Sequence, residues 1–438
     1  MSVRGFIAAL ACAAILVPAV RAQASLAVET FEAAWTIVRD KHFDKSLNGL
    51  DWNAVRAELQ PRAAAAKNVS ELRAVIRDML GRLGLSHFAI LPATSESSGG
   101  SAALSDSSGD AGFDVRWIDR QVIVSEVDPA GPAATAGVRR GWKLTSIDSR
   151  TSTDLLRVLP EAGDERIVHL EVWRLVQSRL RGAPHSTITV GFEDGAGRPV
   201  TLAITRRPEA GQPVTVGSLP TMYVRVGSER RHTPGGGSAG YIRFNVWMAA
   251  VDAPFQRAVD EFRNADGIVI DLRGNPGGLA AMMMGLSGHF VSERKTLGVM
   301  KTRDNELRFP TNPRMVSAAG ERVEPFGGPV AILVDALSGS ASECFSGGMQ
   351  SIGRVKVFGQ TSMGQALPAQ FTKLPNGDVL IHAFGDFVTA DGTRLEGRGV
   401  IPDFPVPLTR ADLLAGRDRT LESALAWIDR ARASSGRP

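Results

Sequence analysis

Two apolar runs, each followed by a turn rich in glycine or serine, most constrain how this chain can fold. Residues 267–272 read Gly-Ile-Val-Ile-Asp-Leu and lead into the glycine turn (residues 274–278), whereas residues 330–334 read Val-Ala-Ile-Leu-Val and lead into Ser-Gly-Ser-Ala-Ser at 338–342. Continuous apolar runs of this length are typical of parallel strands that are buried on both faces. Because a helical pattern follows each turn, the sequence predicts a layered α/β core with its functional site at the strand-to-helix turns.

The glycine turn admits two interpretations. A dinucleotide-binding loop requires the spacing G-x-G-x-x-G and an acidic residue about 20 positions later. Here the glycines are spaced G-x-x-G-G, and the apolar stretch 279–284 follows them. The sequence therefore favours a tight turn that presents N–H groups to a developing oxyanion over a loop that binds phosphate.

Composition places the chain among globular proteins and limits its partners. Of its 438 residues, 43% are hydrophobic and 22% are charged, and the net charge is only +4, which excludes a disordered or fibrous chain. No run of Lys and Arg offers a face for phosphates, so we expect no nucleic-acid partner. The histidines are scattered, and Cys344 is the single cysteine after the N-terminal apolar stretch, so we expect no disulfide, no metal site and no cofactor.

The N-terminus has the pattern of an export signal. A basic residue precedes an apolar stretch at 6–20, and small residues follow it. The stretch is shorter than the roughly 20 residues that span a membrane, and no later segment qualifies, so we expect no integral membrane span. A lipid anchor through Cys12 is the alternative, but the preceding residues 9–11 fit such a site poorly. We expect a signal peptide at 1–22 and an exported protein, periplasmic or secreted.

Three segments follow this signal. Residues 26–94 carry apolar side chains at helical spacing, with a candidate helix start at 68–70. A linker rich in Ser, Gly and Ala at 95–109 precedes the β-rich segment (residues 110–208), where apolar residues alternate. Residues 212–430 contain both apolar runs and form the predicted core.

The β-rich segment resembles a PDZ domain. Gly-Pro-Ala at 131–133 and Gly-Trp-Lys-Leu-Thr-Ser-Ile-Asp at 141–148 occur in PDZ order, although the stretch 155–188 fits the pattern only with an insertion. PDZ domains bind the C-terminus of an extended peptide by strand addition, and backbone N–H groups hold its carboxylate. The alternative is a β-rich domain without a ligand. The resemblance implies a carboxylate-binding turn of three residues: Gly112, Phe113 and Asp114.

Motifs of the predicted core resemble the tail-specific, or C-terminal processing, peptidases and the related tricorn core. They are Asp-Leu-Arg-Gly-Asn-Pro-Gly-Gly at 271–278, Ser-Ala-Ser-Glu at 340–343 and Asp-Gly-x-x-x-Glu-Gly-x-Gly-Val-x-Pro-Asp at 391–403. Together with the helical segment and the PDZ-like domain, the resemblance covers nearly all of the chain after the signal. It implies a crotonase-like α/β core and a serine peptidase of bacterial type.

The chain departs from the tail-specific peptidases at one catalytic position. Their lysine base lies 25 residues after the nucleophile, but position 365 here is Gln, which cannot accept a proton from serine. The tricorn-like branch uses a histidine that follows a serine near the end of the helical segment, and a glutamate of the closing motif. Serine is a weak nucleophile until a base such as this imidazole accepts its proton. This resemblance implies four catalytic residues: the nucleophile Ser340, the base His87, the orienting carboxylate Glu396 and the supporting hydroxyl of Ser86.

The family resemblance also implies which N–H groups stabilise the oxyanion and which partner the chain binds. Gly277 and Ala341 supply the expected oxyanion N–H groups, with Gly278 as the alternative to Gly277. The expected partner is a peptide or protein bound by its C-terminus at the PDZ-like domain. Two other functions stay open: a non-catalytic peptide- or ligand-binding protein on the same fold, similar to interphotoreceptor retinoid-binding protein, and a scaffold that acts through the PDZ-like groove. The substrate, the cleavage preference and the oligomeric state do not follow from the sequence.

Overall fold

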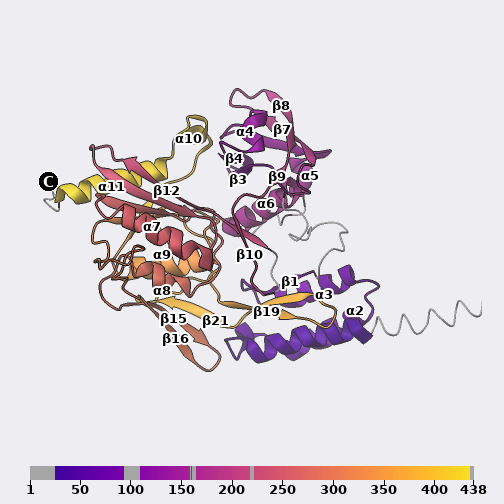
Figure 1. The fold of residues 1–438 in the computed structure, drawn as a ribbon. Coiled ribbons are helices and arrows are strands. Elements are labelled where there is room, and N and C mark those ends of the chain that lie inside the picture. The colour runs from indigo at the N-terminus through magenta and orange to yellow at the C-terminus, as the bar shows by residue number, and fades with distance from the viewer. Residues whose placement is uncertain (1–24, 93–108, 158, 160–163, 218–220, 435–438) are drawn as a thin grey trace, which may run out of the picture. The chain divides into compact units, whose positions relative to one another are not determined.

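The computed structural model describes residues 25–92, 109–157, 159, 164–217 and 221–434 (Figure 1). The predicted export signal and nearly all of the predicted linker therefore lie outside the described residues. Within these ranges no helix is both long enough and apolar enough to cross a membrane. The chain divides into two compact units. The smaller unit combines the N-terminal segment with residues 300–307 and 367–386, and the larger unit contains the remainder.

A six-stranded sheet forms the centre of the larger unit. Strand β12 is antiparallel to β13, and every other pair of neighbours is parallel. All residues of β14 and β17, the two predicted apolar runs, are buried, as parallel strands with both faces covered require. The strands in spatial order are β12 (Val226–His232), β13 (Ser238–Phe244), β14 (Gly267–Asp271), β17 (Val330–Val334), β18 (Lys356–Gly359) and β22 (Phe404–Pro405).

Helices pack against this sheet. The C-terminal helix α11 (Arg419–Ser434) buries Leu425 and Ile428 against Val269 and Leu333 of the central strands. The other helices pack against one another and, through the first and last of them, against β13 and β18 (Figure 1). They are α7 (Asp252–Glu261), α8 (Met282–Ser287) and α9 (Ala341–Ser351). The predicted mixed α/β fold is therefore confirmed.

The β-rich segment forms an antiparallel sheet of its own in the larger unit. The short helix α4 (Pro132–Ala136) begins at the Gly-Pro-Ala turn and ends at Gly137, whose φ of 94° lies in the left-handed region that glycine tolerates. The stretch 155–188, which departs from the PDZ pattern, holds the 16-residue helix α6 (Glu165–Leu180). The strands in spatial order are β3 (Phe113–Ile118), β4 (Gln121–Val127), β5 (Lys143–Ile147), β7 (Thr187–Glu193) and β8 (Pro199–Thr205), with β6 (Arg150–Thr151) paired to β5.

Helices dominate the smaller unit. Residues 25–41 are helical, and α2 (Trp52–Ala64) and α3 (Val69–Gly81) follow. Asn68 accepts the N–H of Glu71 and caps α3, which confirms the predicted helix start. Apolar residues of all three helices form one core, in which Phe31, Leu59 and Ile76 are fully buried.

Two strands that come from far along the chain complete the smaller unit. Strands β20 (Val379–Ala383) and β19 (Ala369–Lys373) join β1 (Ala89–Leu91) in an antiparallel sheet. Arg73 of α3 donates to both carboxylate oxygens of the buried Asp378, at 2.7 and 2.9 Å. The sequence analysis placed residues 367–386 in a continuous core segment and did not predict this pairing. A further sheet contains β16 (Glu306–Pro310), β15 (Thr296–Thr302) and β21 (Gly385–Thr389).

Candidate active site

Ser340 stands immediately before α9, at the turn that follows β17. Its φ of 51° and ψ of −118° are unusual for a residue other than glycine, and such a backbone costs about 1–3 kcal/mol. Two hydrogen bonds hold the residue there, because its N–H lies 2.9 Å from the carbonyl oxygen of Gln365 and 3.0 Å from Oε2 of Glu343. A strained serine between a strand and a helix is a recurrent arrangement of nucleophiles.

The glycine turn lies directly against Ser340. A Cβ on Gly277, whose φ is 102°, would lie 2.6 Å from the Cβ of Ser340 and 2.9 Å from the nitrogen of Ala341, so only glycine fits here. The N–H of Gly277 donates to Oδ1 of Asn275 at 3.0 Å. Over the described ranges, the N–H groups of Gly278 and Ala341 donate no hydrogen bond. This arrangement favours Gly278 over Gly277 as a donor to an oxyanion.

Glu343 is fully buried and joins the start of α9 to the loop that contains position 365. Its Oε1 accepts hydrogen bonds from Oγ of Ser362 (2.5 Å) and the N–H of Gly364 (2.6 Å). Its Oε2 accepts the N–H groups of Ser340 and Gln365, both at 3.0 Å. Burial raises the pKa of the Glu343 carboxyl to about 7, although these four hydrogen bonds oppose the rise. The sequence analysis quoted Glu343 within a motif but assigned it no role.

This raised pKa leads to a prediction about stability. Between the ordinary glutamate pKa of 4.5 and about 7, the folded chain keeps a proton that the unfolded chain has released. The Glu343 carboxyl should therefore lower the free energy of unfolding by about 3 kcal/mol as the pH rises through this window, while the buried imidazoles of His289 and His382, whose pKa values burial lowers to about 4, act in the opposite direction. Glu343→Gln should remove that decrease, whereas Glu321→Gln, at an exposed carboxylate, should keep it. Denaturant titrations from pH 4.5 to 8 measure the free energy of unfolding of both variants. If this free energy depends on pH in Glu343→Gln as it does in the wild type, the prediction is wrong.

Glu396 contacts the same loop from the closing motif. Its carboxylate is buried, and Oε2 accepts the N–H of Ala366 at 2.9 Å. The preceding residue, Gln365, offers its carbonyl oxygen to the N–H of Ser340. Two consecutive residues thus connect Ser340 to Glu396, and Gln365 contributes to this link through its backbone.

Ser86 and His87 belong to the smaller unit, between α3 and β1. Oγ of Ser86 lies 2.7 Å from Nδ1 of His87, within hydrogen-bond distance. His87 has a φ of 59°, which again is uncommon for a residue with a side chain. The smaller unit therefore brings this hydroxyl and imidazole together, and the larger unit connects Ser340 with Glu396.

The three residues of the predicted carboxylate-binding turn make contacts of their own. The N–H of Gly112 donates to Oδ1 of Asp110 at 3.0 Å. Phe113 begins β3 and is buried. Because Asp110 already accepts the N–H of Gly112, a peptide carboxylate would compete with Asp110 for that N–H group. The carboxylate of Asp114 accepts three side-chain hydrogen bonds, from Arg116 (2.6 Å), Trp173 (2.7 Å) and Gln177 (2.9 Å).

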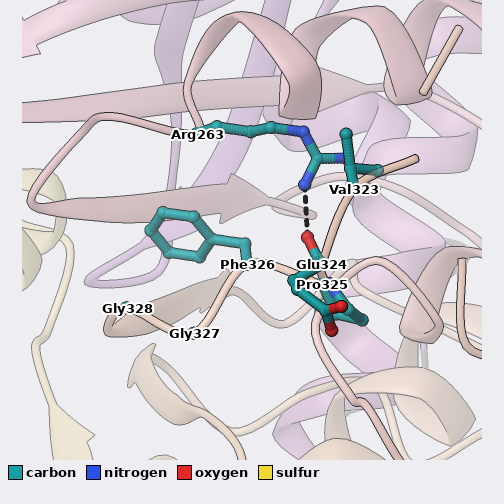
Figure 2. Close-up of a pocket in the computed structure, with 7 residues that line it drawn as sticks. All are labelled: Arg263, Val323, Glu324, Pro325, Phe326, Gly327 and Gly328. Atoms are coloured by element: carbon teal, nitrogen blue, oxygen red, sulfur yellow. Dashed lines mark hydrogen bonds between the residues drawn. The ribbon is translucent and has the colours of Figure 1, made fainter. Parts of the chain in front are cut away.

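A cavity elsewhere in the core contains none of the predicted site residues. It has a volume of about 290 Å³ and is lined by Arg263 and residues 323–328 (Figure 2). Nη1 of Arg263 donates to the carbonyl oxygen of Glu324 at 2.5 Å, and the guanidinium also pairs with Asp260. In the part of the chain that the structure describes, no group of three or more His, Cys, Asp or Glu side chains is arranged to hold a metal ion.

Two family models match parts of this chain. Residues 238–406 match peptidase family S41, and residues 28–81 match the tricorn protease C1 domain. The S41 match contains the glycine turn, Ser340 and Glu396. The chain therefore carries a peptidase family S41 domain and is a serine peptidase, a hydrolase, as the sequence motifs predicted.

Several of the relatives and solved structures to which this chain is similar are named as C-terminal processing proteases. The chain is 24% identical over 385 residues to the carboxyl-terminal-processing protease of Picosynechococcus sp., which covers 85% of this chain and 82% of the relative. The solved photosystem II D1 C-terminal processing protease is 22% identical, with a TM-score of 0.57 over 91% of this chain and 98% of that chain. Mature CPAF is 13% identical, with a TM-score of 0.64 over 94% of this chain and 99% of that chain. These two structures share the fold.

Proposed function

We propose that this chain is an exported serine endopeptidase that cuts peptides or the C-terminal tails of proteins, with Ser340 as the nucleophile. The observation that carries the proposal is the strained backbone of Ser340, with the glycine turn packed against it and the N–H groups of Gly278 and Ala341 not engaged elsewhere in the described ranges. Acyl transfer requires a nucleophile beside two such donors, because negative charge develops on the attacked carbonyl oxygen.

In the proposed reaction, His87 is the general base. A neutral imidazole takes the proton of Oγ of Ser340 as that oxygen attacks the scissile carbonyl, and then gives the proton to the leaving amine. Gly278 and Ala341 stabilise the oxyanion. Water completes the cycle by hydrolysing the acyl-enzyme.

The proposed supporting residues act by orientation. Ser86 lies at Nδ1 of His87, where a hydrogen bond fixes the ring and its tautomer. Glu396 is buried and accepts the N–H of Ala366, so its carboxylate is fixed against the loop that also holds Ser340. Such a carboxylate can orient the base and stabilise its protonated form.

We also propose that the core is crotonase-like and that the β-rich segment is a PDZ-like domain that receives the C-terminus of the substrate. In support, α4 and the strand β5 follow each other at the positions of the PDZ motifs. A relative and a structural neighbour are named for C-terminal processing. The N–H of Gly112 is the proposed carboxylate donor, after release from Asp110.

The second candidate is a non-catalytic binding protein on the same fold. Gln365 favours it, because the lysine base of the tail-specific branch is absent at this position. A peptide panel with free and amidated C-termini separates the two candidates. We expect turnover of the free peptides and weaker binding of the amidated ones by about 1.5–3 kcal/mol, the value of a charge-assisted hydrogen bond. Binding without any turnover would favour the non-catalytic protein, and equal affinity for both forms would contradict C-terminal recognition.

A further inference from the structure

We propose that Asp335 and Arg116 form a positioning pair, in which an arginine of the β-rich segment fixes the carboxylate that holds the two catalytic turns of the core. The inference rests on the proposed function, because its value lies in placing the nucleophile and the oxyanion donors. Neither residue belongs to the motifs that the sequence analysis identified.

Asp335 follows β17 directly and is buried, with 5% of its surface exposed. Its Oδ1 accepts the N–H of Gly274 at 2.8 Å, and Gly274 opens the glycine turn. The same oxygen accepts the N–H of Leu337 at 3.1 Å and lies 3.2 Å from Oγ of Ser338. Leu337 and Ser338 lead directly into Ser340. One carboxylate oxygen therefore binds both the glycine turn, which holds the proposed oxyanion donor, and the turn that leads to Ser340.

Arg116 supplies the counter-charge from β3. Its Nε donates to Oδ2 of Asp335 at 2.9 Å, and the two side chains are only 8% and 7% exposed. Nη2 would lie 2.7 Å from a Cβ on Gly274, so the guanidinium packs against the glycine turn itself. A buried carboxylate without a positive partner is costly, and Arg116 is the positive partner that contacts Asp335 here.

A second carboxylate, Asp114 of the β-rich segment, also holds Arg116. Nη1 donates to Oδ2 of Asp114 at 2.6 Å, and Asp114 in turn accepts hydrogen bonds from Trp173 and Gln177 of α6. Trp173 packs with Leu337 of the core in an apolar cluster. A continuous series of hydrogen bonds therefore connects α6 of the β-rich segment with the N–H of Gly274 in the core. It passes through Asp114, Arg116 and Asp335.

Three variants and a matched control test the pair. Arg116→Met leaves the carboxylate of Asp335 buried without its partner, and Asp335→Asn turns an amide N–H₂ toward Arg116. The double variant, Arg116→Met with Asp335→Asn, has neither an unpaired buried carboxylate nor an amide N–H₂ that faces a guanidinium. The control is Arg243→Met, because Arg243 pairs with Glu126 across the same two parts, and no hydrogen bond of the described residues joins its side chain to either turn. The readouts are kcat and KM for a short fluorogenic peptide.

We expect Arg116→Met to lower kcat by about 100-fold, as misplaced reacting groups do, while KM changes less than about threefold. The kcat of the double variant should be at least about tenfold higher than that of Arg116→Met, because the two residues act as a unit. Arg243→Met should keep kcat within about threefold. Additive losses in the double variant, or equal losses in Arg243→Met, would overturn the proposal.

Hydrogen exchange of the backbone tests the same pair without reference to activity. Exchange of the peptide that spans residues 272–280 should speed up in Arg116→Met and remain unchanged in Arg243→Met. If the wild type shows no hydrolysis but this difference appears, the proposed function fails and the positioning pair stands. Unchanged exchange in Arg116→Met would overturn the pair even in an active enzyme.

Discussion

Ser340→Ala is expected to abolish peptide hydrolysis, with kcat lower by about 10⁶-fold, because no other group can form the acyl-enzyme. The fold should survive the change. The hydrogen bonds of Ser340 to Gln365 and Glu343 use its backbone N–H, and alanine keeps that group. Steady-state assays with a fluorogenic peptide and thermal unfolding measure the two effects separately.

The control for this variant is Ser351→Ala, at the other end of α9, where Oγ contacts only the carbonyl oxygen of Gly348 among the hydrogen bonds of the described residues. It should retain full activity. A fluorophosphonate should label the wild type and Ser351→Ala on Ser340 and should leave Ser340→Ala unlabelled. Turnover that persists in Ser340→Ala, or a label mapped to another serine, would refute the assignment of the nucleophile.

His87→Ala is expected to lower kcat by about 10⁴-fold or more, as loss of a triad base does elsewhere. Gln365→Ala should cost far less, because both hydrogen bonds of Gln365, to Ser340 and to Glu343, come from its backbone. Wild-type activity should also fall in acid, as an imidazole with an ordinary pKa of about 6.5 becomes protonated. Profiles of kcat/KM between pH 5 and 9 measure this limb.

The ranking of these two variants decides between the branches of the family. An inactive Gln365→Ala with an active His87→Ala would show that the base does not follow the tricorn-like pattern. Glu343→Gln serves as the control for the acid limb, because it removes a carboxyl beside Ser340 whose pKa burial raises to about 7. If the limb disappears in Glu343→Gln, the carboxyl of Glu343 and not the imidazole of His87 controls the pH dependence.

The amino-acid sequence determined the parts of this protein that short, continuous patterns encode. The runs that became β14 and β17 are mostly apolar, and such runs, bounded by turn residues, are typical of parallel strands that are buried on both faces. Asn68 marks the start of α3 because a cap acts on the next three residues. The glycine turn was found in the same way, since a turn between a strand and a helix is a local structure, whereas Ser340 was assigned through the resemblance of its motif to a peptidase family.

The tertiary structure decided what depends on residues that meet only after folding. The short strands β1, β19 and β20 carry little signal of their own, and their pairing joins residues almost 300 positions apart. Arg116 and Asp335 are separated by 219 positions, so neither predicts the other. The sequence favoured the N–H of Gly277 over that of Gly278 as a donor to the oxyanion, but in the folded chain Asn275 accepts the N–H of Gly277. Such choices depend on burial and hydrogen-bond geometry between distant segments, and no local pattern records them.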